Sequence, residues 1–247
     1  MDEGTEPGSR RRIMGETIVS SVPGLQRGYE LKMSDLRLFR TFNPGDTFST
    51  SVSYVMDPET LTLSYLDHDA EIASANLAEE IQKTVKLLPP FKNLPAPQSV
   101  ICARYSVDQL WYRAGVIGYL NNNSKVNVVF IDYGNDEIIS VEDIRPLSDS
   151  LAKIPQLSIP AVLASIGAPP GGYTRQHRTD ALAILTSTQQ ALFRVTKVEN
   201  DNYFGSLFLV HDENGNREDV ADIFVAKGIA VLKRTRSLIL VELAEKK

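Results

Sequence analysis

The chain has 247 residues, of which 43% are hydrophobic and 23% charged, and its 26 basic and 31 acidic side chains give a formal net charge of −5. This length allows one large domain or two small ones, and the composition is that of an ordinary soluble protein. No apolar run approaches the ~20 residues of a membrane-spanning helix, and the polar N-terminus lacks the apolar segment of a signal peptide. Nucleic-acid-binding proteins usually carry a basic excess, whereas an acidic protein attracts cationic partners.

The cysteine and histidine content gives no sign of a metal or a disulfide. Cys102 is the only cysteine, so no disulfide can form within the chain. The histidines His68, His177 and His211 are widely spaced in the sequence, which argues against a metal site. We therefore expect a reducing, intracellular setting and no cofactor.

Residues 1–43 show the least regular pattern. Arg10, Arg11 and Arg12 follow a polar stretch with Gly and Pro, which predicts a flexible arm. The basic triplet could act as an internal ligand for the aromatic site described below, but a solvated arm is the better interpretation. Residues 29–41 fit neither a helical nor a strand period, so a short helix and an edge strand both remain open there.

Residues 44–97 predict two strands followed by one helix. The first strand alternates with serines at every second position, and the second follows a turn at Asp57-Pro58. The alternating residues are Phe48, Thr50, Val52 and Tyr54, then Leu61, Leu63 and Tyr65. Two strands and one helix do not complete a core, so we expect the rest of this unit elsewhere in the chain.

The predicted helix begins after Asp67 and Asp69, either of which can cap it. Apolar residues recur at three- and four-residue steps and predict the buried stripe, which comprises Ile72, Ala75, Ala78, Ile81, Val85 and Leu88. The opposite face is expected to be solvated and carries Glu79, Gln82, Lys83 and Lys86. Pro89-Pro90 ends the helix, and a Pro-rich connector over residues 91–98 follows.

Residues 105–135 concentrate aromatic side chains in two short clusters, in the sequence YSVDQLWYRAGVIGYLNNNSKVNVVFIDYGN. Strands are predicted at 100–105, 111–120, 125–133 and 136–140, with a closing turn at 143–147. Asn121, Asn122 and Asn123 tolerate the positive φ that a turn between two strands needs. Rings gathered with few apolar neighbours suggest a cage for a cation, and plain core packing is the alternative.

The C-terminal third again mixes strands and helices. A buried strand is predicted over residues 159–166, a helix over 174–186 with Leu182 and Leu185 inward, and strands near 193–197 and 203–210. Asn214-Gly215 predicts a tight turn. Asp219 can cap a last helix that ends near Gly228, and residues 230–232 can add a short strand.

The sequence motifs WYRA at 111–114 and FIDYGN at 130–135 resemble those of the Tudor domain. The element order is similar to that of the extended Tudor domain, in which a Tudor SH3-like barrel is inserted into a split staphylococcal-nuclease-like OB-fold. The resemblance implies a mainly β, α+β fold. It divides the chain into an arm at 1–43, the first part of the OB-fold with a linker helix at 44–97, the barrel at 98–147, the second part at 148–235, and a tail at 236–247. Two incomplete halves should fold together and form a fixed groove.

The resemblance also implies an aromatic cage that reads methylated arginine. Its positions correspond to Tyr105, Tyr112, Phe130 and Tyr133, with Asn135 as the polar partner, while Trp111 would be a core or strand residue. Phe130 and Tyr133 lie three residues apart, so a shared cage needs a bend near residues 132–134. Acidic side chains on or near the barrel can face the ligand or form a solvated rim; they are Asp132, Asp136, Glu137, Glu142 and Asp143. Asp132 can instead support the cage through a hydrogen bond to backbone or to Arg113.

By this resemblance the chain would be a reader module for methylated arginine, with a Piwi-class Argonaute protein as partner. It would act as a scaffold in small-RNA silencing, in cytoplasmic, perinuclear germ granules. A single-stranded RNA-binding OB-type module and a scaffold with an unused cage are the alternatives. A nuclease would need clustered carboxylates for a metal, and Asp57, Asp67 and Asp69 are better explained as turn and cap residues. We therefore expect no enzyme activity.

Overall fold

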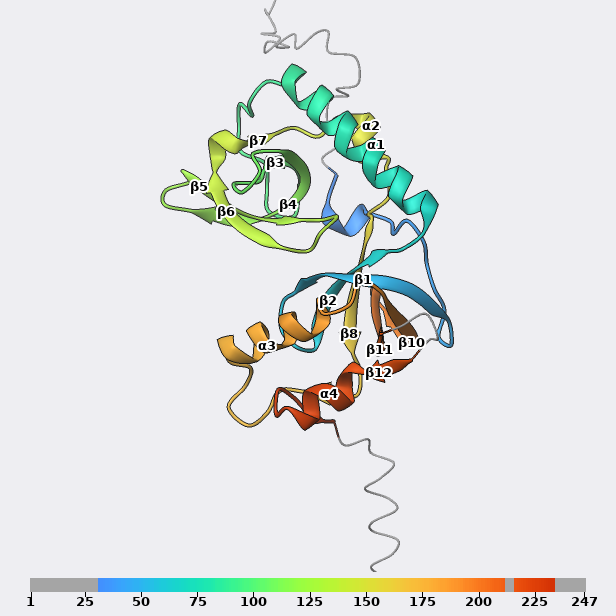
Figure 1. Cartoon of the computed structure of the whole chain (residues 1–247). Helices are drawn as coiled ribbons and strands as arrows, with labels where there is room; N and C mark the ends of the chain where they lie inside the picture. Colours follow the sequence, from blue (N-terminus) through green and yellow to red (C-terminus); the bar gives the residue numbers. More distant parts are fainter. Residues whose placement is uncertain (1–30, 212–215, 234–247) are drawn as a thin grey trace, which may run out of the picture.

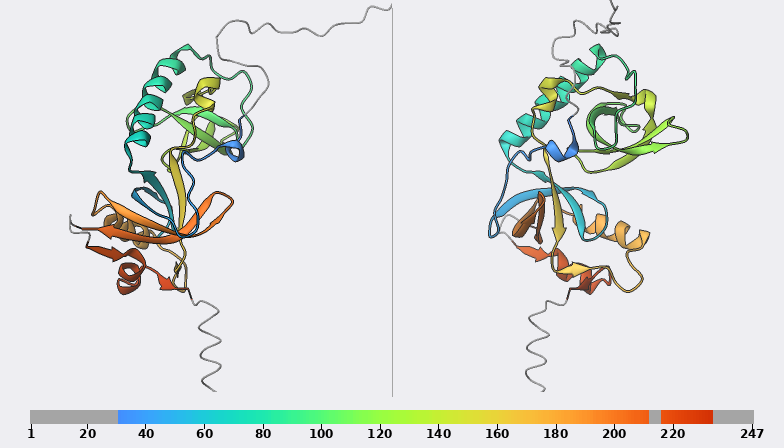
Figure 2. Two further views of the ribbon diagram at one scale, coloured as in Figure 1. Left: turned by 90° about the vertical axis from the view of Figure 1, so that its right-hand side faces the viewer. Right: turned by 180° about the vertical axis from the view of Figure 1, so that it is seen from behind.

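Two β bodies are joined by helix α1 (His68–Thr84) in the computed structural model, which describes residues 31–211 and 216–233 (Figure 1). One body is a five-stranded barrel and the other is a curled six-stranded sheet with small helices. Seen from two further sides, α1 lies along the barrel while strand β8 (Ser158–Leu163) runs down into the second sheet (Figure 2). The mixed, mainly β architecture predicted from the sequence is confirmed.

The barrel has the strand order β6-β5-β4-β3-β7, with all neighbours antiparallel. Its strands are β3 (Val100–Arg104), β4 (Trp111–Leu120), β5 (Lys125–Phe130), β6 (Asp136–Ser140) and β7 (Ile144–Arg145), with the 3-10 turn η3 (Val141–Asp143) before β7. Val126, Val128 and Phe130 are buried at every second position of β5, as the period of a half-buried strand requires. Positive φ values of 51°, 54° and 64° at the three asparagines of the β4–β5 turn confirm that these residues form it.

The second sheet is assembled from segments that flank the barrel in the sequence. Its order is β10-β1-β2-β8-β11-β12, and an added β10–β11 pairing curls it. The strands are β1 (Thr47–Val55), β2 (Thr60–Tyr65), β8 (Ser158–Leu163), β10 (Ala191–Glu199), β11 (Asn202–Val210) and β12 (Arg217–Asp219). β1 and β2 precede the barrel, and the other four strands follow it. The unit that begins before the barrel is thus completed after it, as the sequence predicts.

Short helices close the ends of this second body. They are α3 (Arg175–Leu185) and α4 (Val220–Ala226), with a two-stranded pair of β9 (Ile166–Gly167) and β13 (Val231–Leu232) beside them. Asp219 caps α4 as predicted, because its carboxylate accepts a hydrogen bond from Ala221 N at 2.8 Å, and Gly228 beyond the helix has a φ of 70°. Asp67 caps α1 in the same way at Ala70 N, 3.0 Å away.

The predicted buried face of α1 is partly wrong. Ile72 is 46% exposed and Ala75 is exposed, whereas Ala70, Leu77 and Ile81 are buried. The helix turns this face toward the barrel and the segment after it, where Leu77 and Ile81 pack with other residues in a small core that includes Cys102, Leu151 and Leu157. Beyond this core, the 3-10 turn η2 (Val85–Leu87) ends the helical stretch before the prolines.

Three further expectations fail for local reasons. Gln82 is not solvated, because its carboxamide donates to Trp111 O at 2.7 Å and accepts from Trp111 N at 3.1 Å. Leu182 is 46% exposed, and α3 instead buries Ala181 and Leu185. A bulge between Val52 and Tyr54 shifts the phase of β1, so that Val55 is buried and Tyr54 is not.

The segment before β1 lies against both bodies. Lys32 bridges to Ser99, the 3-10 turn η1 (Met33–Asp35) follows, and Leu38 bridges to Gln156. Residues 31–41 therefore contain a helical turn and strand-like bridges together, where the sequence left both open. The arginine triplet at 10–12, the predicted turn at 214–215 and the tail at 236–247 lie outside the described residues.

Candidate functional site

Four aromatic side chains meet at one end of the barrel. The ring centroids of Tyr105 and Phe130 are 5.2 Å apart, those of Tyr105 and Tyr112 are 6.3 Å apart, and those of Tyr112 and Phe130 are 6.0 Å apart. Their interplanar angles are 75°, 81° and 84°, so the three rings stand like the faces at the corner of a box. Tyr133 packs edge to face on Tyr112 at 5.3 Å. The structure thus brings together all four aromatic positions predicted from the sequence.

A tight turn after β5 places Tyr133 beside Phe130. β5 ends at Phe130, three residues earlier than predicted. The N–H groups of Tyr133 and Gly134 donate to Phe130 O at 3.1 and 2.7 Å, and Gly134 adopts a φ of 93°. Glycine takes this left-handed conformation without steric cost. The bend that a shared cage requires therefore exists, and it is a hydrogen-bonded turn.

Asn135 follows this turn and directly precedes β6. Its main-chain carbonyl accepts a hydrogen bond from Phe130 N at 2.8 Å, which fixes it next to the ring cluster. The residue is half-buried, and within the described part of the chain its carboxamide makes no hydrogen bond. The carboxamide can donate and accept, so it is available to a ligand.

The loop between β3 and β4 adds a carboxylate that the sequence reasoning missed. Asp108 Oδ2 accepts a hydrogen bond from the Tyr112 hydroxyl at 2.6 Å, and Oδ1 accepts from Leu110 N at 2.9 Å. The loop is closed by two backbone bonds, Tyr105 N to Leu110 O at 2.9 Å and Gln109 N to Tyr105 O at 3.0 Å. Asp108 thereby holds the Tyr112 ring in place and puts a negative charge beside the cluster. The signal available in the sequence was an Asp four residues before an aromatic position.

Two tyrosines of the cluster, Tyr112 and Tyr133, have a raised pKa and stay protonated well into the alkaline range. Burial raises the pKa of Tyr112, and the hydrogen bond to Asp108 and its charge raise it further. Burial also raises the pKa of Tyr133, followed by the charges of Asp132 and Asp108, while a hydrogen bond from Ser74 of α1 opposes the shift. Neutral rings with a nearby carboxylate form an environment that attracts a cation.

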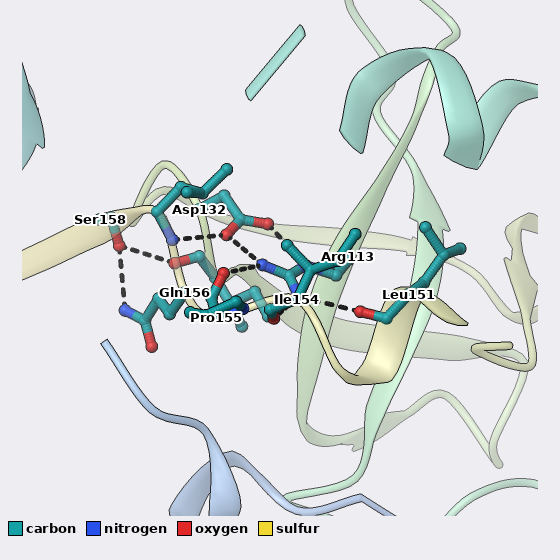
Figure 3. A network of polar contacts seen from close by, with 9 residues as sticks. Arg113, Asp132, Leu151, Ile154, Pro155, Gln156 and Ser158 are labelled. Carbon is teal, nitrogen blue, oxygen red and sulfur yellow. Dashed lines mark hydrogen bonds and ion pairs between the residues drawn. The ribbon is translucent and has the colours of Figure 1, made fainter. Parts of the chain in front are cut away.

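Asp132, which directly precedes Tyr133, belongs to a buried network of polar contacts (Figure 3). Its carboxylate receives two hydrogen bonds from Arg113, Nε to Oδ2 at 2.9 Å and Nη2 to Oδ1 at 2.7 Å, and Arg113 is 0% exposed. Asp132 Oδ1 also accepts from Leu157 N at 3.0 Å. Of the roles considered for Asp132, the geometry favours support of the cage through Arg113 and backbone.

The same arginine binds the segment that leaves the barrel. Arg113 donates to the carbonyls of Leu151, Ile154 and Pro155, in or directly after the short helix α2 (Asp149–Ala152). Ser158 at the start of β8 donates to Ile131 O at 2.7 Å. Arg113 on β4 and the β5–β6 turn are therefore tied to the strand that enters the second sheet, and the cage cannot shift independently of that strand.

The remaining acidic candidates make contacts of their own. Asp136 accepts a hydrogen bond from Tyr54 of β1 at 3.1 Å, and Glu137 accepts from Ser106 N, next to Tyr105, at 3.3 Å. Asp143 pairs with Arg104 on another part of the barrel. Trp111 packs beside the α1 core with two guanidinium groups 5.3 and 6.0 Å from its ring, and it is not among the rings of the cluster.

A groove of about 770 Å³ lies between α1 and the barrel, with Tyr133 as part of its wall. Ser64, Asp67, Glu71 and Ser74 line one side, and Asp132 and Leu157 line the other. Tyr133 is 39% exposed, so its ring belongs both to the cluster and to the groove. A peptide whose side chain is held in the cluster could continue into this acidic groove.

Among the residues that the structure describes, no three His, Cys, Asp or Glu side chains gather in a way that could hold a metal ion. No helix among the same residues is long and apolar enough to cross a bilayer.

Comparison with solved structures gives the same architecture. The chain superposes on the extended Tudor domain of human TDRD1, solved with a symmetrically dimethylated peptide, with a TM-score of 0.72 and 26% identity over 83% of this chain and 100% of that one. The extended Tudor domain of Drosophila melanogaster Papi, solved with a Piwi N-terminal peptide, has the same fold at a TM-score of 0.63 and 16% identity, covering 76% and 100% of the two chains.

Proteins with similar sequences also contain Tudor domains by name. Human Tudor domain-containing protein 1 is 30% identical over 193 residues, which are 77% of this chain but only 16% of that protein. Mouse Tudor domain-containing protein 6 is 33% identical over 132 residues, 53% of this chain and 6% of that protein. The chain therefore spans a small part of the length of these relatives. The Tudor domain model matches residues 42–165, about half of the sequence, and with the structural likeness it shows that this chain belongs to the Tudor domain family, in its extended form.

Proposed function

We propose that this chain reads methylated arginine in peptides and that Tyr105, Tyr112, Phe130, Tyr133 and Asn135 form its binding site. The observation that carries the proposal is the box of four rings, one of which opens onto an acidic groove. It is supported by the extended Tudor domain of human TDRD1, which was solved with a symmetrically dimethylated peptide.

The chemistry of methylarginine suits such a box. A guanidinium is planar and weakly hydrated, and methylation keeps its charge while adding apolar surface and removing donors. A desolvated cation–π contact contributes about 2 kcal/mol. Asn135 can hydrogen-bond a remaining N–H group, which fixes an orientation that the rings alone leave free. The charge of Asp108 adds long-range attraction for any cationic form.

The cage is most accessible at Tyr133. The ring pairs at 5.2–6.3 Å between centroids are perpendicular neighbours, so they form adjoining walls of the box and not two opposed faces. Phe130 is 1% exposed and Tyr112 is held by Asp108, whereas Tyr133 is 39% exposed. Tyr133 is therefore the wall past which the ligand would enter.

The relatives also support a proposal about the partner and the cellular setting. Tudor domains are binding modules, and we assign no catalysis to this one. Structures of similar folds carry peptides of MILI and of Piwi, which makes an arginine-methylated peptide of a Piwi-class protein the proposed partner. A scaffold role in small-RNA silencing, in cytoplasmic and perinuclear germ granules, would accompany that partner. The flanking peptide residues would lie in the groove beside Tyr133.

A titration series tests the proposal. An Arg-Gly/Arg-Ala peptide is offered unmethylated, symmetrically dimethylated and asymmetrically dimethylated, and binding is measured by calorimetry. One methylated form should bind with a Kd on the order of micromolar to tens of micromolar, as a small anchor with limited backbone contact predicts. Tyr133→Ala and Asn135→Ala should each weaken it about tenfold or more, since each removes one desolvated contact. Tyr173→Ala is the matched control, because Tyr173 lies on the second body and donates to Glu59.

Two outcomes would refute this function. One is that no form of the peptide binds, with Tyr133→Ala behaving like the unmodified chain. The other is that methylated and unmethylated peptides bind equally and the Tyr173 control weakens them as much as the cage variants do.

A further inference from the structure

The outer face of the second sheet carries aromatic and basic side chains that the cage does not use. Tyr203, Leu207 and Leu209 of β11 point into the core, so Phe204 and Phe208 point outward, where both are half-buried. We call the surface formed by Phe204, Phe208, Arg194, Lys197 and Arg217 the outer β face. It belongs to β10, β11 and β12, away from the barrel (Figure 1).

Cations lie over both rings. The guanidinium carbons of Arg194 and Arg217 are 5.3 and 5.4 Å from the Phe208 centroid, and Lys197 Nζ is 5.5 Å from the Phe204 centroid. Phe208 is thus flanked by one arginine from each neighbouring strand. The flat face of a stacked guanidinium can receive a second planar group on its other side.

The charge of this face differs from that of the whole chain, which is −5. Lys197 pairs with Glu199, but neither Arg194 nor Arg217 forms an ion pair with a described residue. The Asp219 carboxylate lies opposite Phe208, interacts electrostatically with Arg194 and also caps α4. Among the described residues around Phe208, the two arginines outnumber this one carboxylate, which leaves a local positive charge that attracts an anion.

We propose that the outer β face binds single-stranded RNA. Phosphates complement the cations, and bases can stack on the rings and on the arginines, the combination that single-strand-binding surfaces use. Phe204 and Phe208 are four residues apart on one strand, about 13 Å, which allows two separate bases to stack. The neighbouring strand presents Thr47 opposite Arg194 and Ser49 opposite Leu192, and such hydroxyls can hydrogen-bond a ribose 2′-OH. An acidic peptide would use the charges but not the rings.

The test uses the full chain and a fluorescein-labelled oligouridine of about 15 nucleotides, long enough for one such fold. Fluorescence anisotropy at low salt should show saturable binding, with a slope of about −2 in log affinity against log salt if three cations each neutralise one phosphate. Phe208→Leu keeps an apolar side chain and should weaken binding about tenfold through lost stacking. Arg194→Gln with Arg217→Gln should weaken it at least as much. Lys86→Glu, on the exposed side of η2, is the charge control and should have little effect.

Several outcomes would overturn the proposal. They are the absence of binding at low salt, equal affinity for duplex RNA or for the matching DNA strand, and displacement of the RNA by polyglutamate with Phe208→Leu unchanged. If Phe208→Leu does not fold by circular dichroism, the arginine variants decide the matter. Tyr133→Ala should leave RNA binding intact, and the arginine variants should leave methylarginine binding intact. Failure at one site is therefore distinguishable from failure at the other.

Discussion

Replacing Asp132 by alanine should destabilise the chain more than any loss of a surface ion pair. The change removes both acceptors of the Arg113 fork and the acceptor of Leu157 N–H, while Arg113 remains fully buried. Breaking a buried pair by deleting one partner costs about 3–5 kcal/mol. The orphaned Leu157 amide adds to that cost, and the three carbonyls that Arg113 retains offset part of it. We expect a loss of about 3–5 kcal/mol and a Tm lower by about 10 °C.

Urea unfolding followed by fluorescence measures this loss directly. Trp111 is the only tryptophan, and its backbone is held by Gln82 of α1, so its emission reports the contact between barrel and helix. Asp143→Ala is the matched control, because Asp143 also pairs with an arginine but its side chain is 25% exposed and that of Arg104 is 41% exposed. Such a pair contributes about 1 kcal/mol or less.

If Asp132→Ala and Asp143→Ala lowered the free energy of unfolding equally, the reasoning about the buried network would be refuted. Asp132→Asn refines the test, since an asparagine can still accept the Leu157 N–H bond while the charge is lost. It should fall between the unmodified chain and the alanine variant.

Three other perturbations separate effects at the site from effects on the fold. Asp108→Asn should weaken methylarginine binding about threefold to tenfold at low salt by removing charge beside the rings, and spectrophotometric titration should show a tyrosine pKa moving back toward its ordinary value. Gly134→Ala should destabilise far more than Gly45→Ala in thermal melts. Both glycines have positive φ, but an added Cβ meets no atom at Gly45 and clashes with Thr62 Oγ1 at Gly134. Burial raises the pKa of the Cys102 thiol to about 12, so the thiol ionises at lower pH in the unfolded chain than in the folded one. The free energy of unfolding should therefore fall between about pH 9 and 12, and the contribution of Cys102 should be constant below that range. In urea titrations across this range, Cys102→Ala should reduce the dependence of the free energy of unfolding on pH.

The four aromatic positions could be predicted from residue type and order in the sequence. The arrangement of their rings in space could not. Strand periodicity alone would have put Phe130 and Tyr133 on opposite faces. The turn that unites them depends on the φ of Gly134 and on two hydrogen bonds to one carbonyl. The sequence suggests a turn at Gly134. It does not show that a Cβ at this position would clash with Thr62 of β2.

Contacts between distant segments explain why other predictions from the sequence were wrong or incomplete. Gln82 looks solvated in a helical pattern, yet it pairs with the backbone of Trp111, 29 residues away. Ile72 fits an apolar stripe, yet it is exposed because α1 turns toward the barrel and the linker after it. Asp108 carries no periodic signal, since its importance comes from the position of one hydroxyl. The hydrophobic periodicity of a segment shows which of its residues share a face. It does not show which other segment that face contacts.

The split sheet bears on how this chain folds as it leaves the ribosome. Leu63 of β2 pairs with Ile159 of β8, so the hairpin of β1 and β2 emerges long before its partner strand is synthesised. The barrel is contiguous and can close first, while the hairpin waits with an open edge. That edge is a template for pairing with other nascent chains. Faster synthesis of the segment between β2 and β8, or a chaperone that covers the open edge, should therefore raise the yield of native protein more than either would for a sheet made from one continuous segment.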